Sequence, residues 1–469
     1  MHLESFFNNN NNNNNFVYCV DTARKLNYGE FLNLSRKTAS LLADLGVSSD
    51  DRVFFSTTNS IELYLAWLAT IILGAEIVLI DPNYSDDLTE SIFNKLNPIL
   101  FVSEQKEFSL CKVLRPSELC KLINLYKPYV GFSMKNPNVI SFTSGTESLP
   151  KGVVRDVGSY IDNAIKFSSE VCIDSPNKNI LSTFPGYYLG GFYNLFLIPI
   201  VNGWKITIIP DFSPAFMARF WSIVKENSVD ILWLVPSIIN LLNIFESRKR
   251  EKKHQDFSSL VKIVLCGTAP LLHSSREQFK ENFGLEILEN YALSETLFIS
   301  SQHYGDKNHS VGKLMPYVEI NSAQGIEVKT PYLLNKYLIL DGEDKVFDSS
   351  EFFNTGDIGE VICKNLMITG RKKDVIIKGG INISPKYIEE QLDNIDIDEI
   401  AVIGAPDEIS GEKIICYYVS SIKLDSKLRT LSKSKLSSIF RPDKFIKIDK
   451  MPKTSSGKTI KKQLRDLYK

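Results

Sequence analysis

Paired cysteines, excess charge of one sign and long apolar runs are what this chain lacks. Its seven cysteines are odd in number and scattered, and they form neither a CxxC pair nor a cluster with histidine. This argues against a disulfide framework and a zinc site, and it is typical of a reducing cytoplasm. The formal net charge is −1. A chain so close to neutral has no overall attraction to nucleic acid or a membrane surface, and we expect neither as a partner.

No segment is long and apolar enough to predict a membrane span. The most apolar stretch, Leu63 to Ile80, contains Glu76 and is interrupted by Gly74. A helix that runs into a buried strand explains this pattern better than a helix across a bilayer. The N-terminus has acidic Glu4 and no basic segment before an apolar one, so we expect no signal peptide and a cytoplasmic location.

The chain is long enough for about two to four domains, and its apolar pattern predicts their class. Apolar, β-rich runs alternate with helical stretches. Strands are predicted at 52–55, 77–80, 204–209, 231–235 and 261–266, and helices through Trp67 and over 216–226. Strands separated by helices of this length predict an α/β fold with largely parallel sheets.

Turn residues and short strands predict the domain boundaries. The asparagine run from Asn8 to Asn15 has no apolar periodicity, so residues 1–15 are expected to be a disordered tail, with a self-associating tract as the alternative. Residues 16–370 are expected to form a large N-terminal domain of stacked α/β sheets, with a β-rich subdomain near 320–370. Residues 371–469 are expected to form a small α+β domain after the Thr369-Gly370 break.

The strongest local motif is the segment from Ser141 to Gly152, SFTSGTESLPKG, which follows an apolar strand end. Small hydroxyl residues and glycine let backbone N–H groups approach a phosphate closely, and Lys151 adds positive charge. The spacing is not that of a P-loop. By itself the segment therefore indicates either a phosphate-binding loop or a turn rich in serine and glycine.

This loop resembles the TSGTTGxPKG signature of the adenylate-forming superfamily, which includes acyl-CoA synthetases, aryl-acid ligases, peptide-synthetase adenylation domains and firefly-type luciferases. Further segments resemble that family's motifs in the same order along the chain: Tyr291–Thr296 (YALSET), Thr355–Asp357 (TGD), Gly370–Asp374 (GRKKD), Lys378–Pro385 (KGGINISP), Gly404–Asp407 (GAPD) and Pro452–Lys458 (PKTSSGK). The resemblance covers nearly the whole chain.

The resemblance implies an enzyme that joins a carboxylic acid to the α-phosphate of ATP and then transfers the acyl group to a thiol. It implies ATP with Mg²⁺ as cofactors and CoA as the default acceptor. The phosphopantetheine of an acyl carrier protein acting in trans is the alternative acceptor. The small C-terminal domain is implied to be mobile, with one pose for each half-reaction. A nucleotide-binding relative without turnover is the alternative of another class.

The same resemblance implies roles for individual residues. Those implied to contact ATP or AMP are Thr143, Ser144, Gly145, Thr146, Lys151, Gly267, Thr268, Ala269, Tyr291, Ala292, Ser294, Asp357, Arg371 and Lys458. Lys458, Glu295 and Thr146 are implied to be catalytic, with Glu295 also binding Mg²⁺. The acyl pocket is implied to contain Tyr187, Tyr188, Gly191 and Asn290, the hinge Lys373, and the tunnel for the thiol Lys378, Gly379 and Gly380.

The sequence departs from the family pattern in two places. Glu147 and Ser148 replace Thr-Gly in the phosphate loop, and a carboxylate beside phosphates is unfavourable unless it points outward or pairs with Lys151 or Arg155. Tyr188 replaces a histidine, which suggests an aromatic gate or, alternatively, a core aromatic. The aspartate that holds the α-amino group in amino-acid-activating relatives is missing from residues 184–193. An aryl or fatty acid is therefore the expected substrate.

Overall fold

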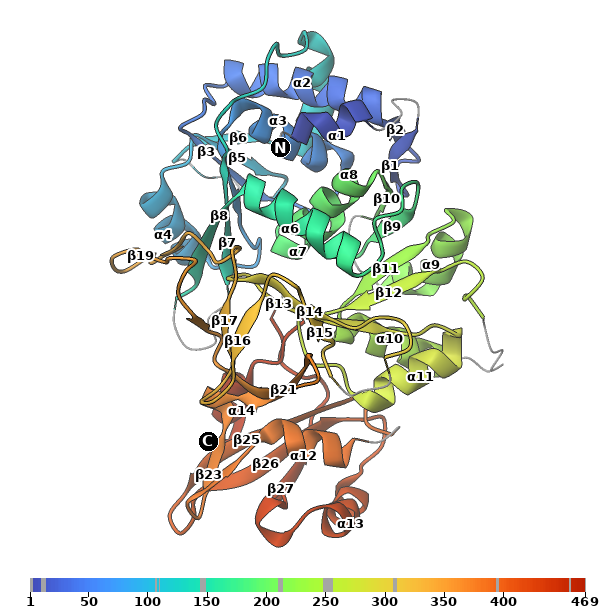
Figure 1. Cartoon of the computed structure of the whole chain (residues 1–469), viewed down its shortest axis with the longest axis vertical. Coiled ribbons are helices and arrows are strands. Elements are labelled where there is room, and N and C mark those ends of the chain that lie inside the picture. Colours follow the sequence, from blue (N-terminus) through green and yellow to red (C-terminus); the bar gives the residue numbers. More distant parts are fainter. Residues whose placement is uncertain are drawn as a thin grey trace.

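The computed structural model describes residues 3–9, 14–105, 108, 110–143, 149–209, 214–247, 256–306, 310–393, 396–454 and 457–468. Over these ranges the chain is a mixed α/β protein, which confirms the predicted fold class. Figure 1 shows an upper part that contains the N-terminal residues and a lower part, coloured orange to red, that contains the C-terminal ones.

The first large sheet has the strand order β19-β18-β8-β7-β4-β3-β5-β6 within the described residues. Strands β7, β4, β3, β5 and β6 are parallel, and β8, β18 and β19 extend the sheet in antiparallel fashion. The strands are β3 (Arg52–Ser56), β4 (Glu76–Leu79), β5 (Leu100–Ser103), β6 (Lys112–Leu114), β7 (Asn138–Thr143), β8 (Lys151–Asp156), β18 (Lys336–Leu338) and β19 (Lys345–Val346). The associated helices are α2 (Tyr28–Asp44), α3 (Ile61–Leu73), α4 (Asp86–Leu96), α5 (Pro116–Leu122) and η1 (Ile123–Leu125). The helix and strand predicted within 63–80 are confirmed by α3 and β4.

The second large sheet has the order β2-β1-β10-β9-β11-β12-β13-β14-β15-β22-β21, and its strands from β1 to β13 are parallel. The strands are β1 (Asn15–Cys19), β2 (Lys25–Asn27), β9 (Asn179–Ser182), β10 (Lys205–Ile208), β11 (Ile231–Leu234), β12 (Ile263–Cys266), β13 (Leu288–Leu293), β14 (Leu297–Ser301), β15 (Lys313–Leu314), β21 (Asp357–Ile362) and β22 (Asn365–Arg371). The helices are α6 (Val157–Glu170), α7 (Leu189–Phe192), η2 (Tyr193–Leu197), α8 (Ile198–Asn202), α9 (Pro214–Glu226), α10 (Pro236–Ser247) and α11 (His273–Phe283). Strands predicted at 204–209, 231–235 and 261–266 are confirmed.

The main hydrophobic core joins side chains of both large sheets. All residues of α3 except Glu62 are buried, as expected for a helix that is apolar on every side. The ring of Trp67 lies 5.1 Å from that of Tyr64, 5.2 Å from Phe192 and 5.3 Å from Phe196, between centroids. Figure 1 shows α6 and α7 between the two sheets. This packing holds the strand ends of both sheets in fixed relative positions.

The short strands of residues 320–370 do not form one β-rich subdomain, contrary to the prediction. β16 (Glu319–Asn321), β17 (Glu327–Lys329) and β20 (Phe353–Asn354) form a small sheet of their own. In contrast, β18 pairs with β8 and β22 pairs with β15, so these strands cover edges of the two large sheets. Strands of two or three residues carry too little pattern to predict which edge they will pair with.

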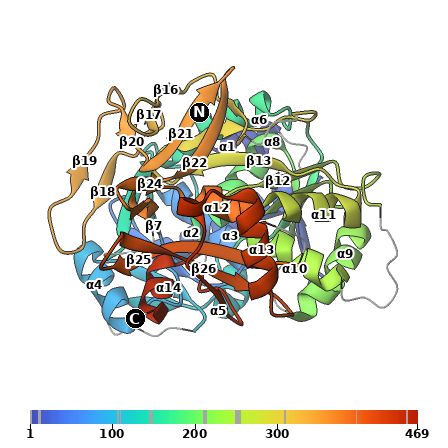
Figure 2. The ribbon, with the colours of Figure 1, turned by 90° about the horizontal axis from the view of Figure 1, so that it is seen from below.

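The C-terminal residues form a second body with its own hydrophobic cores. β22 ends at Arg371, and the short helix η3 (Lys372–Asp374) leads into a sheet of order β24-β23-β26-β25, with β27 paired to β26. Figure 2 shows this body from below, with helices against β25 and β26. Its elements are β23 (Ile376–Lys378), β24 (Ile381–Ile383), β25 (Glu399–Asp407), β26 (Gly411–Val419), β27 (Lys444–Lys447), α12 (Pro385–Leu392), α13 (Asp425–Lys435), η4 (Ser438–Phe440) and α14 (Lys461–Tyr468).

The N-terminal tail differs from its prediction. Leu3–Asn9 form helix α1, in which Leu3 is 2% exposed and Phe7 is fully buried. The Phe7 ring lies 5.8 Å from that of Phe16, between centroids, so the helix packs on the main core. Leu3 and Phe7 are four residues apart, which places them on one helix face. This pair of apolar residues is too short a pattern to predict a helix beside the asparagine run. Residues 10–13 of the run lie outside the described ranges, and Asn15 begins β1.

Among the described helices, none has the length and the apolar character needed to cross a bilayer.

Candidate active site

Most of the predicted site residues lie at or near the carboxyl ends of parallel strands, where open α/β sheets bind their ligands. Thr143 ends β7, and Lys151 begins β8 across the loop. Gly267 to Ala269 follow β12, and Asn290 to Ala292 belong to β13. Ser294 and Glu295 form the turn from β13 to β14. Residues 144–148, which include Ser144, Gly145, Thr146 and Glu147, lie outside the described ranges.

Asp357 is held by donors from two strands. It is 5% exposed and lies directly opposite Arg371 in the antiparallel pair β21–β22, so the sheet register sets this contact. The Arg371 Nε donates to Asp357 Oδ1 at 2.6 Å, and the Tyr291 hydroxyl donates to Oδ2 at 2.5 Å. Burial raises the pKa of Tyr291 well above its usual value, and the charge of Asp357 adds to the rise. Tyr291 therefore remains a neutral donor.

Glu295 is held both through its side chain and through its backbone. The Tyr337 hydroxyl donates to Glu295 Oε1 at 2.6 Å. From inside the protein, Arg155 donates to the carbonyl oxygens of Ser294 at 2.7 Å, Glu295 at 2.6 Å and Tyr332 at 2.8 Å. Sequence reasoning missed Tyr337, which lies within the predicted β-rich region near 320–370, and no motif marks it.

Arg155 was one of two partners suggested for Glu147 from the sequence. It does not lie on the surface. Its side chain is fully buried, and its guanidinium group bonds backbone carbonyls. An arginine can satisfy several carbonyls at once because its donors are arranged in a rigid fork. Lys151, the other suggested partner, is exposed and its Nζ lies 5.4 Å from the centroid of the Tyr337 ring.

Lys458 comes from the C-terminal body and reaches the same place. Surrounding protein lowers its pKa, and Arg371 lowers it further, whereas Glu295 and Asp357 act in the opposite direction. The residue as a whole keeps exposed surface. Lys373 also lowers the pKa, so two carboxylates and two other cations lie near enough to Lys458 to act on its charge.

The segment after β12 has an unusual backbone. A Cβ at Gly267 would lie 2.6 Å from Asn290 Oδ1, so only glycine fits beside that side chain. Thr268 has φ +75°, a conformation that a β-branched residue rarely adopts. Its Oγ1 and the Asn290 Nδ2 are buried and have no hydrogen-bond partner among the described residues. These polar groups lie on the segments that the resemblance assigns to adenine and acyl binding.

Of the predicted acyl-binding residues, Tyr187 and Tyr188 lie between β9 and α7, Gly191 lies in α7, and Asn290 lies in β13. A Cβ at Gly191 would come 2.2 Å from the carbonyl oxygen of Pro185, so the chain requires glycine here. Tyr187 and Tyr188 are partly buried. Burial raises the pKa of Tyr188 to about 12, and the nearby charge of Glu295 contributes to the rise. Tyr188 is therefore close to the other site residues.

Of the residues predicted for the hinge and the thiol tunnel, Lys373 lies near enough to Lys458 to lower its pKa, whereas Lys378 pairs within the C-terminal body. Lys373 lies in η3, between the two bodies. Lys378 Nζ bonds both oxygens of Asp443 at 2.8 Å within the C-terminal body. Gly379 and Gly380 form the turn between β23 and β24, with φ values of +57° and +78° that favour glycine. In this arrangement Lys458, and not the glycine turn, faces the N-terminal body.

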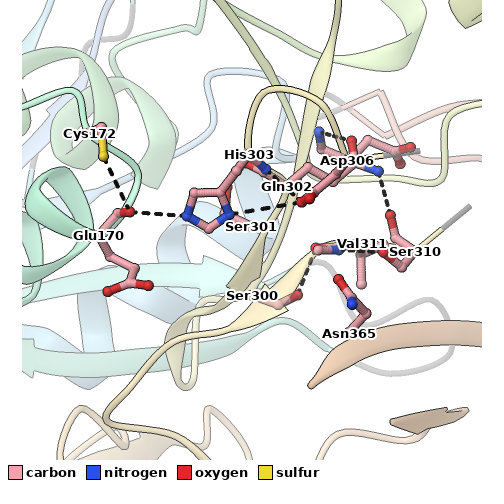
Figure 3. Close-up of polar contacts among 12 residues, drawn as sticks. Glu170, Cys172, Ser300, Ser301, Gln302, His303, Asp306, Ser310, Val311 and Asn365 are labelled. Carbon is pink, nitrogen blue, oxygen red and sulfur yellow. Dashed lines mark hydrogen bonds and ion pairs between the residues drawn. The ribbon is translucent and has the colours of Figure 1, made fainter. Parts of the chain in front are cut away.

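A separate polar cluster lies near the end of α6 (Figure 3). The His303 ring donates through Nε2 to the Glu170 carbonyl oxygen at 3.0 Å, and its Nδ1 lies 3.9 Å from Asp306 Oδ2. These contacts attach the loop after β14 to α6. Within the part of the chain that the structure describes, no group of three or more His, Cys, Asp or Glu side chains is arranged to hold a metal ion.

Comparison with known structures shows the fold. An ATP-bound MatB from Rhodopseudomonas palustris matches with a TM-score of 0.87 at 22% identity, over 99% of this chain and 98% of that one. The anthranilate CoA ligase AuaEII matches with a TM-score of 0.88 at 17% identity, over 100% and 97%. The o-succinylbenzoate CoA synthetase MenE from Bacillus subtilis, in complex with ATP and a magnesium ion, has a TM-score of 0.82 at 20% identity, over 99% of each chain. The chain has the same fold as these three proteins.

Family models identify the chain more closely. The model described as AMP-binding enzyme matches residues 6–322, and the model of the AMP-binding enzyme C-terminal domain matches residues 389–458. The chain belongs to the AMP-binding enzyme family, which confirms the resemblance. Relatives that match along almost the whole chain are named acid–thiol ligases. A 2-succinylbenzoate–CoA ligase of Lactococcus lactis is 26% identical, over 94% of this chain and 96% of that protein. The long-chain-fatty-acid–CoA ligase FadD13 of Mycobacterium tuberculosis is 23% identical, over 95% and 93%.

Proposed function

We propose that this enzyme activates a carboxylic acid with ATP to form an acyl-adenylate and pyrophosphate, and then transfers the acyl group to a phosphopantetheine thiol. One observation carries the proposal: Asp357 is hydrogen-bonded by Tyr291 and Arg371, and the charges of Asp357, Glu295 and Arg371 of the N-terminal body act on the pKa of Lys458 of the C-terminal body. This set offers both signs of charge that the reaction needs. Cations stabilise the anionic reactants, and carboxylates hold the ribose and a metal ion.

The nucleotide would lie against β13 and β21. Tyr291 offers its ring to adenine, with the backbone of 267–269 on the other side. The Asp357 oxygens, now held by Tyr291 and Arg371, would accept bonds from the ribose hydroxyls. Thr143 and Lys151 stand at the two ends of the loop proposed to bind the phosphates, with Ser144, Gly145 and Thr146 between them.

Glu295 is the residue proposed to hold Mg²⁺. A carboxylate at a turn fits this ion, which binds proteins through one or two carboxylates and takes its other ligands from phosphates and water. The Tyr337 hydroxyl donates a hydrogen bond to Glu295 Oε1, which fixes the orientation of the Glu295 side chain. The bound ion would neutralise charge on the phosphates.

Lys458 is proposed to position the reacting groups. A carboxylate oxygen of the acid attacks the α-phosphorus, a new P–O bond forms, and the bond to the pyrophosphate oxygen breaks. Negative charge increases around the α-phosphate during this step. An ammonium group placed between the carboxylate and the α-phosphate stabilises that charge and aligns the attack.

The acid would bind beside Tyr187, Tyr188, Gly191 and Asn290. Residues 184–193 contain no aspartate to hold an α-amino group, which favours an aryl or fatty acid over an amino acid. The named relatives support both types, because one acts on 2-succinylbenzoate and another on long-chain fatty acids.

CoA is the proposed acceptor, with an acyl carrier protein acting in trans as the alternative. For this step we propose that the C-terminal body moves about Lys373 and brings Lys378, Gly379 and Gly380 to the acyl-adenylate. Glycines suit a place where a thin ligand passes close to backbone. We also propose a cytoplasmic location, where CoA and ATP are available.

Mass spectrometry of the reaction products tests this proposal. The enzyme is incubated with ATP, Mg²⁺ and a panel of aryl, short-chain, long-chain and amino acids, with and without CoA or a phosphopantetheinylated carrier protein. We expect acyl-AMP without acceptor and a thioester with CoA. ATP binding without acyl-AMP from any acid would favour the non-catalytic relative instead.

A further inference from the structure

The two bodies meet through a contact that completes a helix. Helix α11 begins after Leu272, whose side chain makes no capping bond, and its first turn contains no acidic residue. Asp393 of the C-terminal body supplies both the capping bond and the negative charge at the start of α11. Its Oδ2 accepts the backbone N–H of Ser274 at 2.9 Å, and its Oδ1 accepts the Ser274 hydroxyl at 2.5 Å. Ser274 is the second residue of α11, where an N-cap side chain ordinarily accepts a bond.

The placement of Asp393 is unfavourable for its own helix. Asp393 directly follows α12, so its charge lies at the negative end of that helix dipole. Beside Ser274 the same charge lies at the positive end of α11, where a carboxylate is stabilising. The charge of Asp393 is therefore disfavoured by the dipole of α12 and favoured by the dipole of α11 in the other body. The carboxylate therefore favours the observed arrangement of the two bodies.

Contacts within the C-terminal body connect Asp393 to Lys458. Glu389 lies one turn before Asp393 in α12, and its Oε1 accepts bonds from Lys461 Nζ at 3.0 Å and from the Val402 amide at 2.8 Å. Lys461 is three residues after Lys458. Asp393 and Lys458 therefore lie on segments of the C-terminal body that are joined by hydrogen bonds.

Contacts on the other side lead to the nucleotide-binding segment. α11 follows directly after the loop that contains Gly267 and Thr268. A second contact lies nearby, where a Cβ at Gly457 would come 2.7 Å from Ser237 Oγ of α10. Asn240 of the same helix donates to the carbonyl oxygen of Asp398 at 3.3 Å. The first turns of α10 and α11 thus form the face that receives the C-terminal body.

We propose that Asp393 is a positioning residue that holds Lys458 at the reaction centre by capping α11 across the two bodies. The inference rests on the proposed adenylation and adds the residue that stabilises the pose in which it occurs. Loss of the carboxylate lowers the equilibrium constant for that pose by about fivefold to tenfold, the factor that corresponds to loss of an N-cap. The adenylation rate falls by up to the same factor, whereas a step that does not use Lys458 is spared.

The test uses the full chain and three variants. Asp393→Ala removes both bonds, and Asp393→Asn keeps an oxygen acceptor that caps almost as well. Asp396→Ala is the matched control, because that carboxylate pairs with Lys427 inside the C-terminal body. Three quantities are measured: ATP–pyrophosphate exchange, thioester formation from added synthetic acyl-adenylate and CoA, and hydrogen exchange of the amides at the start of α11.

We expect Asp393→Ala to lower pyrophosphate exchange by more than about twofold and up to about tenfold, to change thioester formation by less than twofold, and to lose amide protection at Ser274. Asp393→Asn restores most of the exchange, and Asp396→Ala resembles the wild type. An equal loss of both half-reactions, or unchanged protection at Ser274, would overturn the inference. Failure of the proposed function is recognised separately, because the wild type itself would then show no pyrophosphate exchange with any acid.

Discussion

Arg155 lies beneath the turn that carries Glu295 and donates to the Glu295 carbonyl oxygen at 2.6 Å. The same guanidinium bonds the carbonyls of Ser294 and Tyr332, and it lies 5.3 Å from the centroid of the Tyr160 ring. A buried cation with three backbone acceptors joins the turn at Ser294 and Glu295 and the segment at Tyr332 to strand β8. The direction of Glu295 therefore depends on a residue that has no contact with any proposed substrate.

Replacing Arg155 by leucine is expected to lower the free energy of unfolding by about 2–4 kcal/mol, because three carbonyl groups each lose a hydrogen bond from its guanidinium group, although the Glu295 carbonyl keeps the one from the Leu334 amide. Arg155→Lys should lie between leucine and the wild type, since an ammonium group cannot reproduce the guanidinium fork. Urea denaturation measures both variants. A leucine variant as stable as the wild type would show that water or rearranged backbone satisfies these carbonyls.

Tyr337→Phe is expected to raise the Mg²⁺ concentration needed for half-maximal activity, by about threefold to tenfold, because Glu295 loses one bond that directs it. Titration of activity with Mg²⁺ measures this shift. Tyr332→Phe is the matched control, since the Tyr332 hydroxyl bonds Asp162 rather than a proposed site residue. Equal Mg²⁺ dependence of the two variants would contradict the role given to Tyr337.

Asp357→Asn is expected to weaken ATP binding by about tenfold, because the amide is a poorer acceptor for ribose hydroxyls and no longer balances Arg371. Calorimetric titration of the wild type and variant with ATP provides the comparison. Asp344→Asn, which removes a charge that pairs with Lys336, serves as the control. If both variants bind ATP as tightly as the wild type, the ribose contact proposed for Asp357 is wrong.

The pH dependence of adenylation follows from Lys458. Its pKa is lowered by surrounding protein and by Arg371, so the ammonium group loses its proton at a lower pH than a free lysine does. Since the charged form is the one proposed to act, the rate should fall on the alkaline side at a pH below about 10.4. In Lys458→Arg any remaining activity should lack this decline, because a guanidinium group stays charged.

Much of the fold could be predicted from the sequence because long periodic segments carry it. The run through Trp67 and the strands at 52–55 and 231–235 were marked by apolar pattern alone, and the structure confirms them. The short strands of 320–370 were not assignable, since their pairing depends on which sheet edge is free. Helix α1 was hidden by the asparagine run that follows Phe7.

The candidate site was predictable only where the chain carries motifs. Tyr291, Asp357 and Lys458 were named from short motifs, and the structure brings them together. Arg155, Tyr337 and Asp393 act through contacts between segments far apart in the chain. No local pattern predicts such contacts, because each residue could equally belong to a strand, a surface or a helix end.

ATP–pyrophosphate exchange with the wild type and with Lys458→Ala tests the central claim most directly. We expect the wild-type exchange to depend on one class of carboxylic acid. In the variant the exchange should fall by at least about a hundredfold, since an oriented charge at the reacting centre is removed. ATP binding should persist in both proteins. Equal exchange by the two, or none by a folded wild type with any acid, would contradict the proposed adenylation and the role of Lys458 in it.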